Sequence, residues 1–296
     1  MRPPDRDGVG ASEVSLPHGH WPTCLDFLAE RFPSVSRTEW IARMARIEVF
    51  DERGATVLPS SAYRAGERLF YYRSVATEPR IPFDELIVFQ DEWIVVADKP
   101  HFLPVTPAGR YVRETLLARL KQRLQIDTLA PAHRIDRDTA GLVLFTVQPS
   151  TRGEYQRMFS ERSIEKIYHA IAPYRPDMKL PITHLSRLEE SAAFMQMIEV
   201  AGEANAETQI ALLAAHGAWA RYELRPHSGK KHQLRAHMSA LGLPIVNDRI
   251  YPELKPDGGA EEGWDRPLKL LAKSIAFIDP ITGERRQFTS GRTVDF

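Results

Sequence analysis

Residues 131–145 read PAHRIDRDTAGLVLF and join a charged segment to an apolar run. Four charged side chains and a histidine lie between His133 and Asp138, and the run Gly141–Phe145 follows almost directly. An apolar run of this length after a turn predicts a buried strand. A strand end is a rigid support for a reactive group, but short charged turns with exposed ion pairs are also common. The spacing alone therefore leaves a functional site and a solvated turn equally open.

A second polar segment, EKIYHA at residues 165–170, alternates in the manner of a strand. Alternation places Lys166 and Tyr168 on the same face of that strand. A tyrosine in this position either packs against its own sheet or stacks on a nucleic-acid base. In isolation the packing interpretation is favoured.

A third segment, SGKKHQLRAHM at residues 228–238, predicts a helix that begins near Lys230. Lys231 and Arg235 are four residues apart and would share one cationic face. His232 and His237 are five residues apart, roughly 140° around a helix. That spacing differs from the four-residue spacing of helical zinc ligands, so no metal site is predicted here.

The whole composition sets limits on the class of protein. The chain has 296 residues, which favours about two domains. Its 39 basic and 39 acidic residues give no net charge, so any nucleic-acid surface must come from local clusters. The single cysteine, Cys24, excludes an internal disulfide. Since the longest apolar runs are far shorter than the roughly 20 residues of a membrane span, we expect no membrane association and a cytoplasmic location.

The order of patterns along the chain predicts two domains of unequal size. We expect a disordered leader at residues 1–19, because MRPPDRDGVGASE has no apolar core of a signal peptide. Two short helices and a β-ribbon over 20–75 form a small unit, and 76–84 form a Pro-containing linker. Strands outnumber helices over 85–296 without a regular βαβ rhythm, so the fold class is α+β.

Several enzyme classes lack their signatures in this sequence. The letters His-Arg and Asp also occur in the kinase catalytic loop, but the glycine-rich loop and DFG motif of kinases are missing. There is no Gly-x-Ser-x-Gly elbow, P-loop or GxGxxG. Acyl transfer and nucleotide hydrolysis therefore have no positive support.

Four segments in order resemble the RluA family of RNA pseudouridine synthases. HRIDRDTAGLVLF resembles the family signature HR-L-D-R-D-T-S-G-L-L-L, and SGKKHQLRAHMSALGLPIVNDRIY resembles its block GR-x-HQ-I/L-R-x-H followed by G-x-P-I-x-x-D-x-x-Y. VVADKP resembles a strand that ends in Lys-Pro, and IEKIYHAIA resembles a K-x-Y-x-A strand. The match covers about residues 85–290. Residues 20–75 more loosely resemble the alpha-L RNA-binding module that often precedes this domain.

The resemblance implies a mixed, largely antiparallel central sheet flanked by helices, and isomerisation of uridine in ribosomal or transfer RNA to pseudouridine. It implies no metal and no organic cofactor, and we expect a monomer. Asp136 would be the catalytic aspartate; whether it attacks the sugar, attacks the base or abstracts a proton stays open. Arg235 would pair with Asp136 and favour its charged form. Tyr168 would pack against the target uracil.

The same resemblance assigns further residues to the substrate. Arg134 would enter the position that the flipped base leaves, since the base must leave its stack. Other contacts would come from His133, Lys166, Lys230, Lys231, His232 and Gln233. In the N-terminal module, phosphate contacts would come from Arg37, Arg43 and Arg46. Solvated helix faces are an equal alternative for these three arginines and for Lys230 and Lys231.

Three positions depart from the family pattern. Lys230 replaces a usual Arg, Leu271 replaces a common His, and Pro173 replaces a common Gly. None of them belongs to the Asp136, Tyr168 and Arg235 set. Two other classes remain open: an RNA-binding protein without activity would be expected to lose one of that set, and a glycosidase would use a second acid and release free base.

Overall fold

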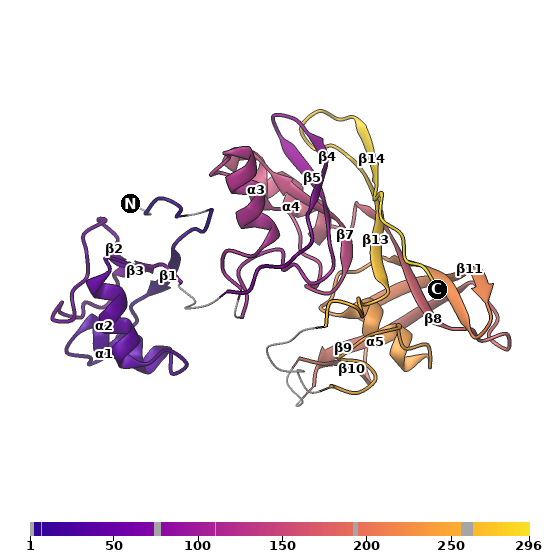
Figure 1. The fold of residues 1–296 in the computed structure, drawn as a ribbon, viewed down its shortest axis with the longest axis horizontal. Helices are drawn as coiled ribbons and strands as arrows, with labels where there is room; N and C mark the ends of the chain where they lie inside the picture. Colours follow the sequence, from indigo (N-terminus) through magenta and orange to yellow (C-terminus); the bar gives the residue numbers. More distant parts are fainter. Residues whose placement is uncertain (1–2, 7, 74–77, 110, 192–194, 256–262) are drawn as a thin grey trace. The chain divides into compact units, whose positions relative to one another are not determined.

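The computed structural model describes residues 3–6, 8–73, 78–109, 111–191, 195–255 and 263–296 (Figure 1). The chain divides into two compact units. Unit 1 contains residues 1–79, 107–114 and 118–127, and unit 2 contains 80–106, 115–117 and 128–296. The first division falls inside the predicted linker at 76–84, of which residues 76 and 77 lie outside the described residues. Within the described ranges, no helix is long and apolar enough to cross a bilayer.

Unit 1 contains two helices and a three-stranded antiparallel sheet. The helices are α1 (Cys24–Arg31) and α2 (Arg37–Ala45), and the strands β1 (Ser12–Ser15), β2 (Val49–Asp51) and β3 (Arg68–Tyr71) have the order β1-β3-β2. Thr23 and Asp26 form a reciprocal capping box that starts α1. Trp40 and Phe27 are fully buried at the centre of this unit.

Two sequence predictions for unit 1 are wrong. Residues 12–15 of the predicted disordered leader form β1, because their backbone pairs with β3 and Leu16 is buried in the core. Arg43 was expected on the solvated face of α2, but it is buried: its Nε donates to Glu39 at 3.0 Å and its guanidinium lies over the Trp40 ring. The aliphatic stem of Arg43 is covered as the arginine packs on that ring.

Unit 2 is built on one large mixed sheet, as predicted. Its strand order is β10-β9-β11-β12-β8-β13-β7-β5-β4, with β14 paired to β13 and β6 paired to β7. Only the β13–β7 pair is parallel among these pairings. The strands are β4 (Leu86–Gln90), β5 (Ile94–Lys99), β6 (Ala130–Pro131), β7 (Ala140–Thr146), β8 (Glu165–Pro173), β9 (Ile182–Glu190), β10 (Met197–Val200), β11 (Ala206–His216), β12 (Trp219–Pro226), β13 (Leu270–Ile278) and β14 (Arg285–Thr289).

Helices pack on this sheet at two places. The 3₁₀ turn η1 (Pro149–Thr151) leads into α4 (Arg152–Ser160), which packs on β5, β7 and β13 through Tyr155 and Met158. α5 (Gln233–Ala240) packs on β8, β11 and β12 through Leu234 and Met238 and also contacts β9 and β10 (Figure 1). A further helix, α3 (Leu116–Leu124), crosses the division between the units.

The helix α5 begins later than its sequence predicts. His232 has φ 51° and lies in the left-handed region directly before Gln233. Lys231 and Arg235 therefore do not share a helical face, and the predicted cationic face of this helix is wrong. Arg235 is buried, whereas Lys231 is exposed in the preceding loop.

The strand β7 confirms the predicted buried strand. All seven residues of Ala140–Thr146 are buried, as expected for a strand with neighbours on both sides and the helix α4 packed on it. Gly141 has φ 111° and pairs with Ala272 of β13. A Cβ at Gly141 would lie 2.3 Å from the carbonyl oxygen of Ala272, so only glycine permits this approach of β7 and β13.

Replacing Gly141 by alanine should destabilise unit 2 strongly. The strain of the positive φ and the clash with Ala272 add, so we expect Gly141→Ala to lower the free energy of unfolding by roughly 3 kcal/mol or more. Gly217→Ala is the matched control, because Gly217 has φ 59° but open space around it. Gly217→Ala should lower the free energy of unfolding by only about 1 kcal/mol. If urea titrations give the same loss of unfolding free energy for the two variants, the close approach of β7 and β13 is contradicted.

Candidate active site

Asp136 lies in the irregular segment that connects β6 to β7, four residues before β7 begins. Its side chain is 29 % exposed, so one side of the carboxylate faces solvent. The backbone carbonyl of Asp136 accepts a hydrogen bond from the N–H of Thr139, which closes a turn onto β7. The buried strand thus presents Asp136 at an accessible edge.

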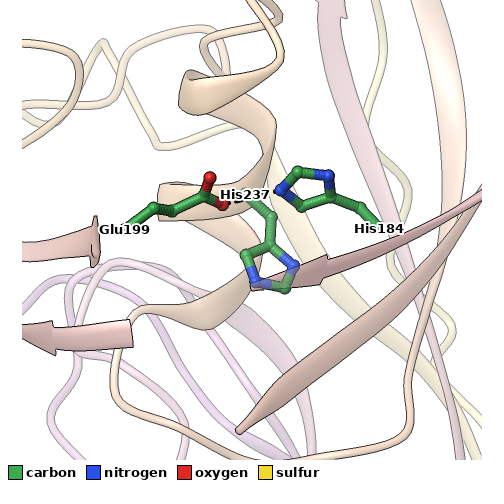
Figure 2. A group of neighbouring side chains, drawn as sticks. All are labelled: His184, Glu199 and His237. Atoms are coloured by element: carbon green, nitrogen blue, oxygen red, sulfur yellow. Dashed lines mark hydrogen bonds and ion pairs between the residues drawn. The ribbon is translucent and has the colours of Figure 1, made fainter. Parts of the chain in front are cut away.

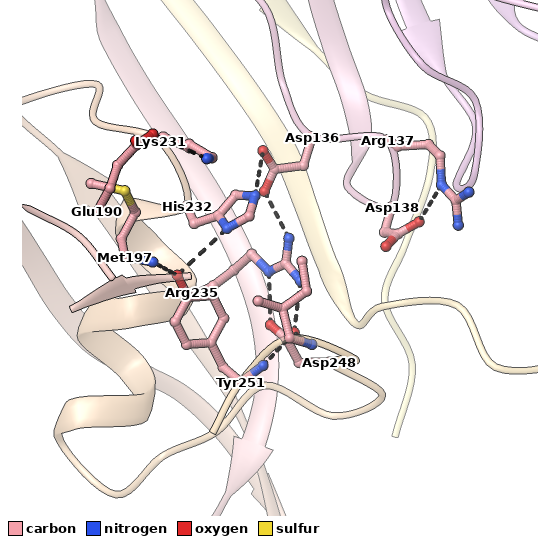
Figure 3. Close-up of polar contacts among 11 residues, drawn as sticks. Asp136, Arg137, Asp138, Glu190, Met197, Lys231, His232, Arg235, Asp248 and Tyr251 are labelled. Atoms are coloured by element: carbon pink, nitrogen blue, oxygen red, sulfur yellow. Dashed lines mark hydrogen bonds and ion pairs between the residues drawn. The ribbon is translucent and has the colours of Figure 1, made fainter. Parts of the chain in front are cut away.

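Arg235 connects Asp136 to a second, buried carboxylate (Figure 3). Its Nη1 donates to Asp136 Oδ2 at 3.0 Å, while Nε and Nη2 donate to the two oxygens of Asp248 at 2.8 and 2.7 Å. Burial by itself would lower the pKa of Arg235, but the hydrogen bonds and charges of Asp248 and Asp136 raise it above its usual value. Arg235 is therefore a permanent cation beside Asp136.

Asp248 is fixed by its own backbone neighbours. It is fully buried, and its Oδ1 accepts hydrogen bonds from the N–H groups of Ile250 and Tyr251 at 2.8 and 3.0 Å. A bidentate carboxylate with further backbone donors holds a guanidinium in one orientation. The position of the Arg235 group that reaches Asp136 is thus set by the segment after α5.

His232 lies on the other side of Asp136. Its Nε2 is 3.8 Å from Asp136 Oδ1, and its Nδ1 is 3.5 Å from the Tyr251 hydroxyl (Figure 3). That hydroxyl accepts the N–H of Met197 at 2.7 Å. Burial lowers the pKa of His232, although the charge of Asp136 acts in the opposite direction. The neutral imidazole therefore predominates at neutral pH.

Tyr168 belongs to the same electrostatic environment. It lies on β8, and burial followed by the negative charge of Asp136 raises its pKa far above the usual value. Its hydroxyl consequently stays protonated across the physiological range. The structure thus pairs Arg235 of α5 with Asp136 of the loop before β7, and Tyr168 of β8 lies within reach of the charge of Asp136.

Lys99 supports the loop of Asp136 from within the protein. This last residue of β5 is fully buried, and its Nζ donates to the backbone carbonyls of Arg137 at 2.8 Å and of Pro100 at 2.9 Å. Burial lowers its pKa to about 7, and the charges of Asp138 and Asp136 limit that fall. His101 adds a 2.7 Å contact from Nδ1 to the carbonyl of Asp138.

Gln233 organises the loop before α5 and does not face substrate. Its Oε1 accepts from the Ser228 hydroxyl and from the N–H of Lys230, and its Nε2 donates to Glu207 and Thr208 of β11. All these partners are internal and the side chain is buried. The predicted substrate contact of Gln233 is therefore replaced by a structural one.

His133 is also held by internal partners. Its Nε2 accepts the N–H of Leu144 at 3.1 Å, and its ring stacks on Phe159 with centroids 4.4 Å apart. Burial, with the nearby charge of Lys166, lowers the pKa of His133 to about 3. This neutral, partly exposed ring therefore packs against the core, and its predicted contact with substrate stays a prediction.

The remaining predicted cations differ in exposure. Lys166 is half-buried on β8, its Nζ donates to the carbonyl of Ser228 at 3.2 Å, and burial lowers its pKa to about 8. Arg134 and Lys230 are exposed, and Lys231 makes an exposed ion pair with Glu190 at 3.3 Å. In unit 1, Arg37 pairs with Asp26, and Arg46 pairs with Glu39 and Glu48.

Sequence reasoning did not single out Asp248, Tyr251 or Lys99. All three lie inside quoted motifs, in IVNDRIY and VVADKP. For Lys99 and Asp248 the sequence did contain a signal: each is a charged residue that ends or follows an apolar run. Such a charge, once buried, requires a partner. The partner itself was not visible, since Arg235 precedes Asp248 by 13 residues.

The three departures from the family pattern each have a simple local setting. Leu271 is fully buried in an apolar cluster with Ala140, Ile171 and Val294, so an apolar side chain fits there. Pro173 is the last residue of β8 and lies opposite Trp219, where a missing N–H is tolerated. Lys230 uses its backbone N–H to bond Gln233 and leaves its side chain exposed.

Comparisons with known proteins identify the family. The family model for RNA pseudouridylate synthase matches residues 93–240. The chain is 30 % identical over 237 residues to an uncharacterized RNA pseudouridine synthase, slr1592, of Synechocystis, covering 77 % of this chain and 78 % of that one. The chain belongs to the RluA family of RNA pseudouridine synthases. It is thus an enzyme, an isomerase that forms pseudouridine from uridine in RNA.

Two more similarities agree with this synthase family and its fold. The dual-specificity RNA pseudouridine synthase RluA of Haemophilus influenzae is 30 % identical over 210 residues, which cover 69 % of this synthase and 91 % of that enzyme. The structure of human RNA Pseudouridylate Synthase Domain Containing 1 superposes with a TM-score of 0.58 at 22 % identity, covering 73 % of this synthase and 86 % of that chain. The second similarity confirms the α+β fold.

The buried Lys99 predicts a specific pH dependence of stability. Its pKa is about 7 in the folded protein and near 10.5 when unfolded, so between these values the unfolded chain binds more protons. Stability from this group therefore rises with pH from about 7 to 10.5, by at most about 1.4 kcal/mol per pH unit. Lys99→Met should remove that slope in urea titrations at pH 7, 8 and 9.

Lys273→Met is the control for this measurement. Lys273 also donates to two backbone carbonyls, those of Ser290 and Arg292, but it is only half-buried. The control should keep the wild-type slope. If Lys99→Met also keeps it, Lys99 is not the buried cation that titrates in this range.

Proposed function

We propose that Asp136 is the catalytic residue of this synthase and that it acts on uridine in a folded RNA. The observation that carries the proposal is the 3.0 Å contact between Arg235 and Asp136, because a buried guanidinium held by Asp248 fixes this carboxylate at the solvent-facing edge. An anionic aspartate at a solvent-facing edge can attack the sugar, attack the base or abstract a proton. Each route breaks the bond from N1 to C1′ and forms one from C5 to C1′.

Arg235 and Tyr168 have different parts in this proposal. Arg235 acts through Asp136 and is a positioning residue, since Asp248 occupies its other two donor atoms. Tyr168 provides a ring against which the uracil packs and a hydroxyl that stays protonated. A protonated phenol beside the carboxylate can take part in moving the C5 proton.

Base flipping is the second element of the proposal. The target uridine must leave its stack, which costs a few kcal/mol. Arg134 lies two residues before Asp136 with its side chain exposed, so it can fill the vacated position while the base lies at Asp136. The exposed Lys230 and Lys231 supply charge for the neighbouring phosphates, and half-buried Lys166 supplies it closer to Asp136.

The N-terminal residues 20–75 are proposed to add RNA contacts. Arg37 and Arg46 are exposed on α2 and at its end, whereas Arg43 is buried and is removed from this set. Ion pairs with Asp26, Glu39 and Glu48 must rearrange before these arginines contact phosphate. The contribution of this module is therefore expected to depend steeply on salt.

The RNA class is proposed as ribosomal or transfer RNA. Relatives of this chain include enzymes named tRNA pseudouridine synthase C and a dual-specificity RNA pseudouridine synthase. A cytoplasmic location, a monomeric state and independence of organic cofactors or catalytic metal remain predictions from the sequence. A glycosidase would release free uracil, so analysis of the products separates it from an isomerase.

Replacing Asp136 tests the proposal directly. Asp136→Asn should lower pseudouridine formation at least about a hundredfold, because the amide cannot act as an anionic base or nucleophile. The substrate uridines are identified by pseudouridine mapping of total RNA. The cells lack the gene for this protein and are complemented with the wild-type gene or the Asp136→Asn variant. Tritium release from the C5 position of the uridines in that RNA then gives the rate.

Asp138→Asn is the matched control, since Asp138 lies in the same loop and pairs with Arg137 at 3.0 Å. It should keep most of the activity. The assignment of Asp136 as catalytic residue would be overturned if Asp136→Asn restored pseudouridine. It would also be overturned if every pseudouridine site persisted after deletion of the gene.

A further inference from the structure

One cluster of possible metal ligands lies outside the proposed active site. Among the described residues, His184, Glu199 and His237 form the one group of three or more His, Cys, Asp or Glu side chains whose donor atoms converge (Figure 2). One donor atom from each lies within 4.8 Å of the other two. Two imidazoles and a carboxylate are a donor set that zinc and related ions use.

The three side chains come from three different elements of unit 2. His184 lies on β9, Glu199 on β10 and His237 on α5. His184 Nε2 is 2.7 Å from Glu199 Oε1, and the rings of His184 and His237 meet edge to face with centroids 4.8 Å apart. Side-chain rotations that move the donor atoms by about 1 Å would bring them to the 2.0–2.2 Å distance of zinc–ligand bonds.

The surroundings of His237 suit a metal ligand. Its Nδ1 is 3.0 Å from the Thr208 hydroxyl, and its Nε2 is 3.0 Å from the Ser186 hydroxyl. If one nitrogen binds an ion, the other still donates its N–H to a hydroxyl, which fixes the tautomer and the ring. Both hydroxyls can rotate, so the metal-free cluster is also satisfied.

Charge and access agree with this arrangement. The Glu199 carboxylate supplies negative charge for a cation, and the His237 side chain is fully buried. The side chains of His184 and Glu199 are 20 % and 28 % exposed. An ion can therefore enter from solvent and keep water as a fourth ligand.

We propose that His184, Glu199 and His237 bind one divalent transition-metal ion, with Zn²⁺ as the best-fitting probe. The ion would tie α5 to β9 and β10. Because α5 also carries Arg235, the site stabilises the helix that positions Asp136, but it makes no contact with Asp136. The sequence predicted no metal because it compared only His232 and His237, which are neighbours in the chain and not partners in space.

The test is zinc binding to the untagged full chain. We expect isothermal titration calorimetry to give one Zn²⁺ per chain, and a zinc concentration 100 times the Kd to raise the Tm by roughly 5–10 °C. Co²⁺ should give the visible absorption of a four-coordinate site with nitrogen ligands. Mg²⁺ should cause no shift, since it prefers oxygen ligands in an octahedral geometry.

Variants separate this cluster from other histidines. His184→Ala and Glu199→Gln change partly exposed side chains, so they should fold, keep metal-free activity and bind Zn²⁺ at least about tenfold more weakly. His216→Ala removes an exposed histidine at the end of β11, and this variant should bind Zn²⁺ as wild type does. Absence of one-to-one binding, or equal affinity in His184→Ala, Glu199→Gln and His216→Ala, would overturn the proposal.

Discussion

One guanidinium held between two carboxylates is the interaction on which the proposed site depends. Arg235 is almost fully buried and uses two donor atoms on Asp248 and one on Asp136. A buried cation of this kind is stable only with paired and hydrogen-bonded partners. Asp248 supplies that pairing permanently, which leaves one donor directed at a carboxylate that also faces solvent. The protein thus fixes the position of this aspartate before any substrate is present.

The large sheet makes this interaction possible by bringing distant segments together. Asp136 precedes β7, whose close approach to β13 requires Gly141, and Lys99 holds the same loop from β5. Arg235 comes from α5, which packs on β8, β11 and β12. Tyr168 and Arg235 therefore lie on a strand and a helix, whereas Asp136 lies in a loop held by Lys99. The exposed Arg134, Lys230 and Lys231 lie on loops. This division matches the two tasks, because chemistry needs fixed geometry and RNA contacts tolerate adjustment.

Local patterns in the sequence predicted those strands and helices whose formation depends on residues close together in the chain. The run of β7, the two short helices of unit 1 and the strand of Tyr168 follow from spacing within ten residues. The resemblance of four motifs predicted the family. The start of α5 was missed because His232 adopts a left-handed conformation that its residue type does not signal.

Other features depend on packing between distant segments and were not predictable in this way. Arg43 was expected in solvent because its position on the helix does not reveal that Trp40 and Glu39 receive it. Strand β1 formed where composition predicted disorder, since pairing with β3 overrode the local signal. The cluster of His184, Glu199 and His237 spans more than fifty residues and appears only when β9, β10 and α5 meet.

The single-turnover rate of Arg235→Lys tests whether catalysis needs the bridge from Asp248 through Arg235 to Asp136. Lysine keeps the positive charge, but a single ammonium cannot bond both carboxylates as the fork of arginine does. We expect the single-turnover rate on the mapped RNA to fall about 10- to 100-fold. The Kd for RNA and the folded state should stay close to those of wild type. A folded Arg235→Lys protein with the wild-type rate would contradict the account, because the bridge from Asp248 to Asp136 would then be dispensable.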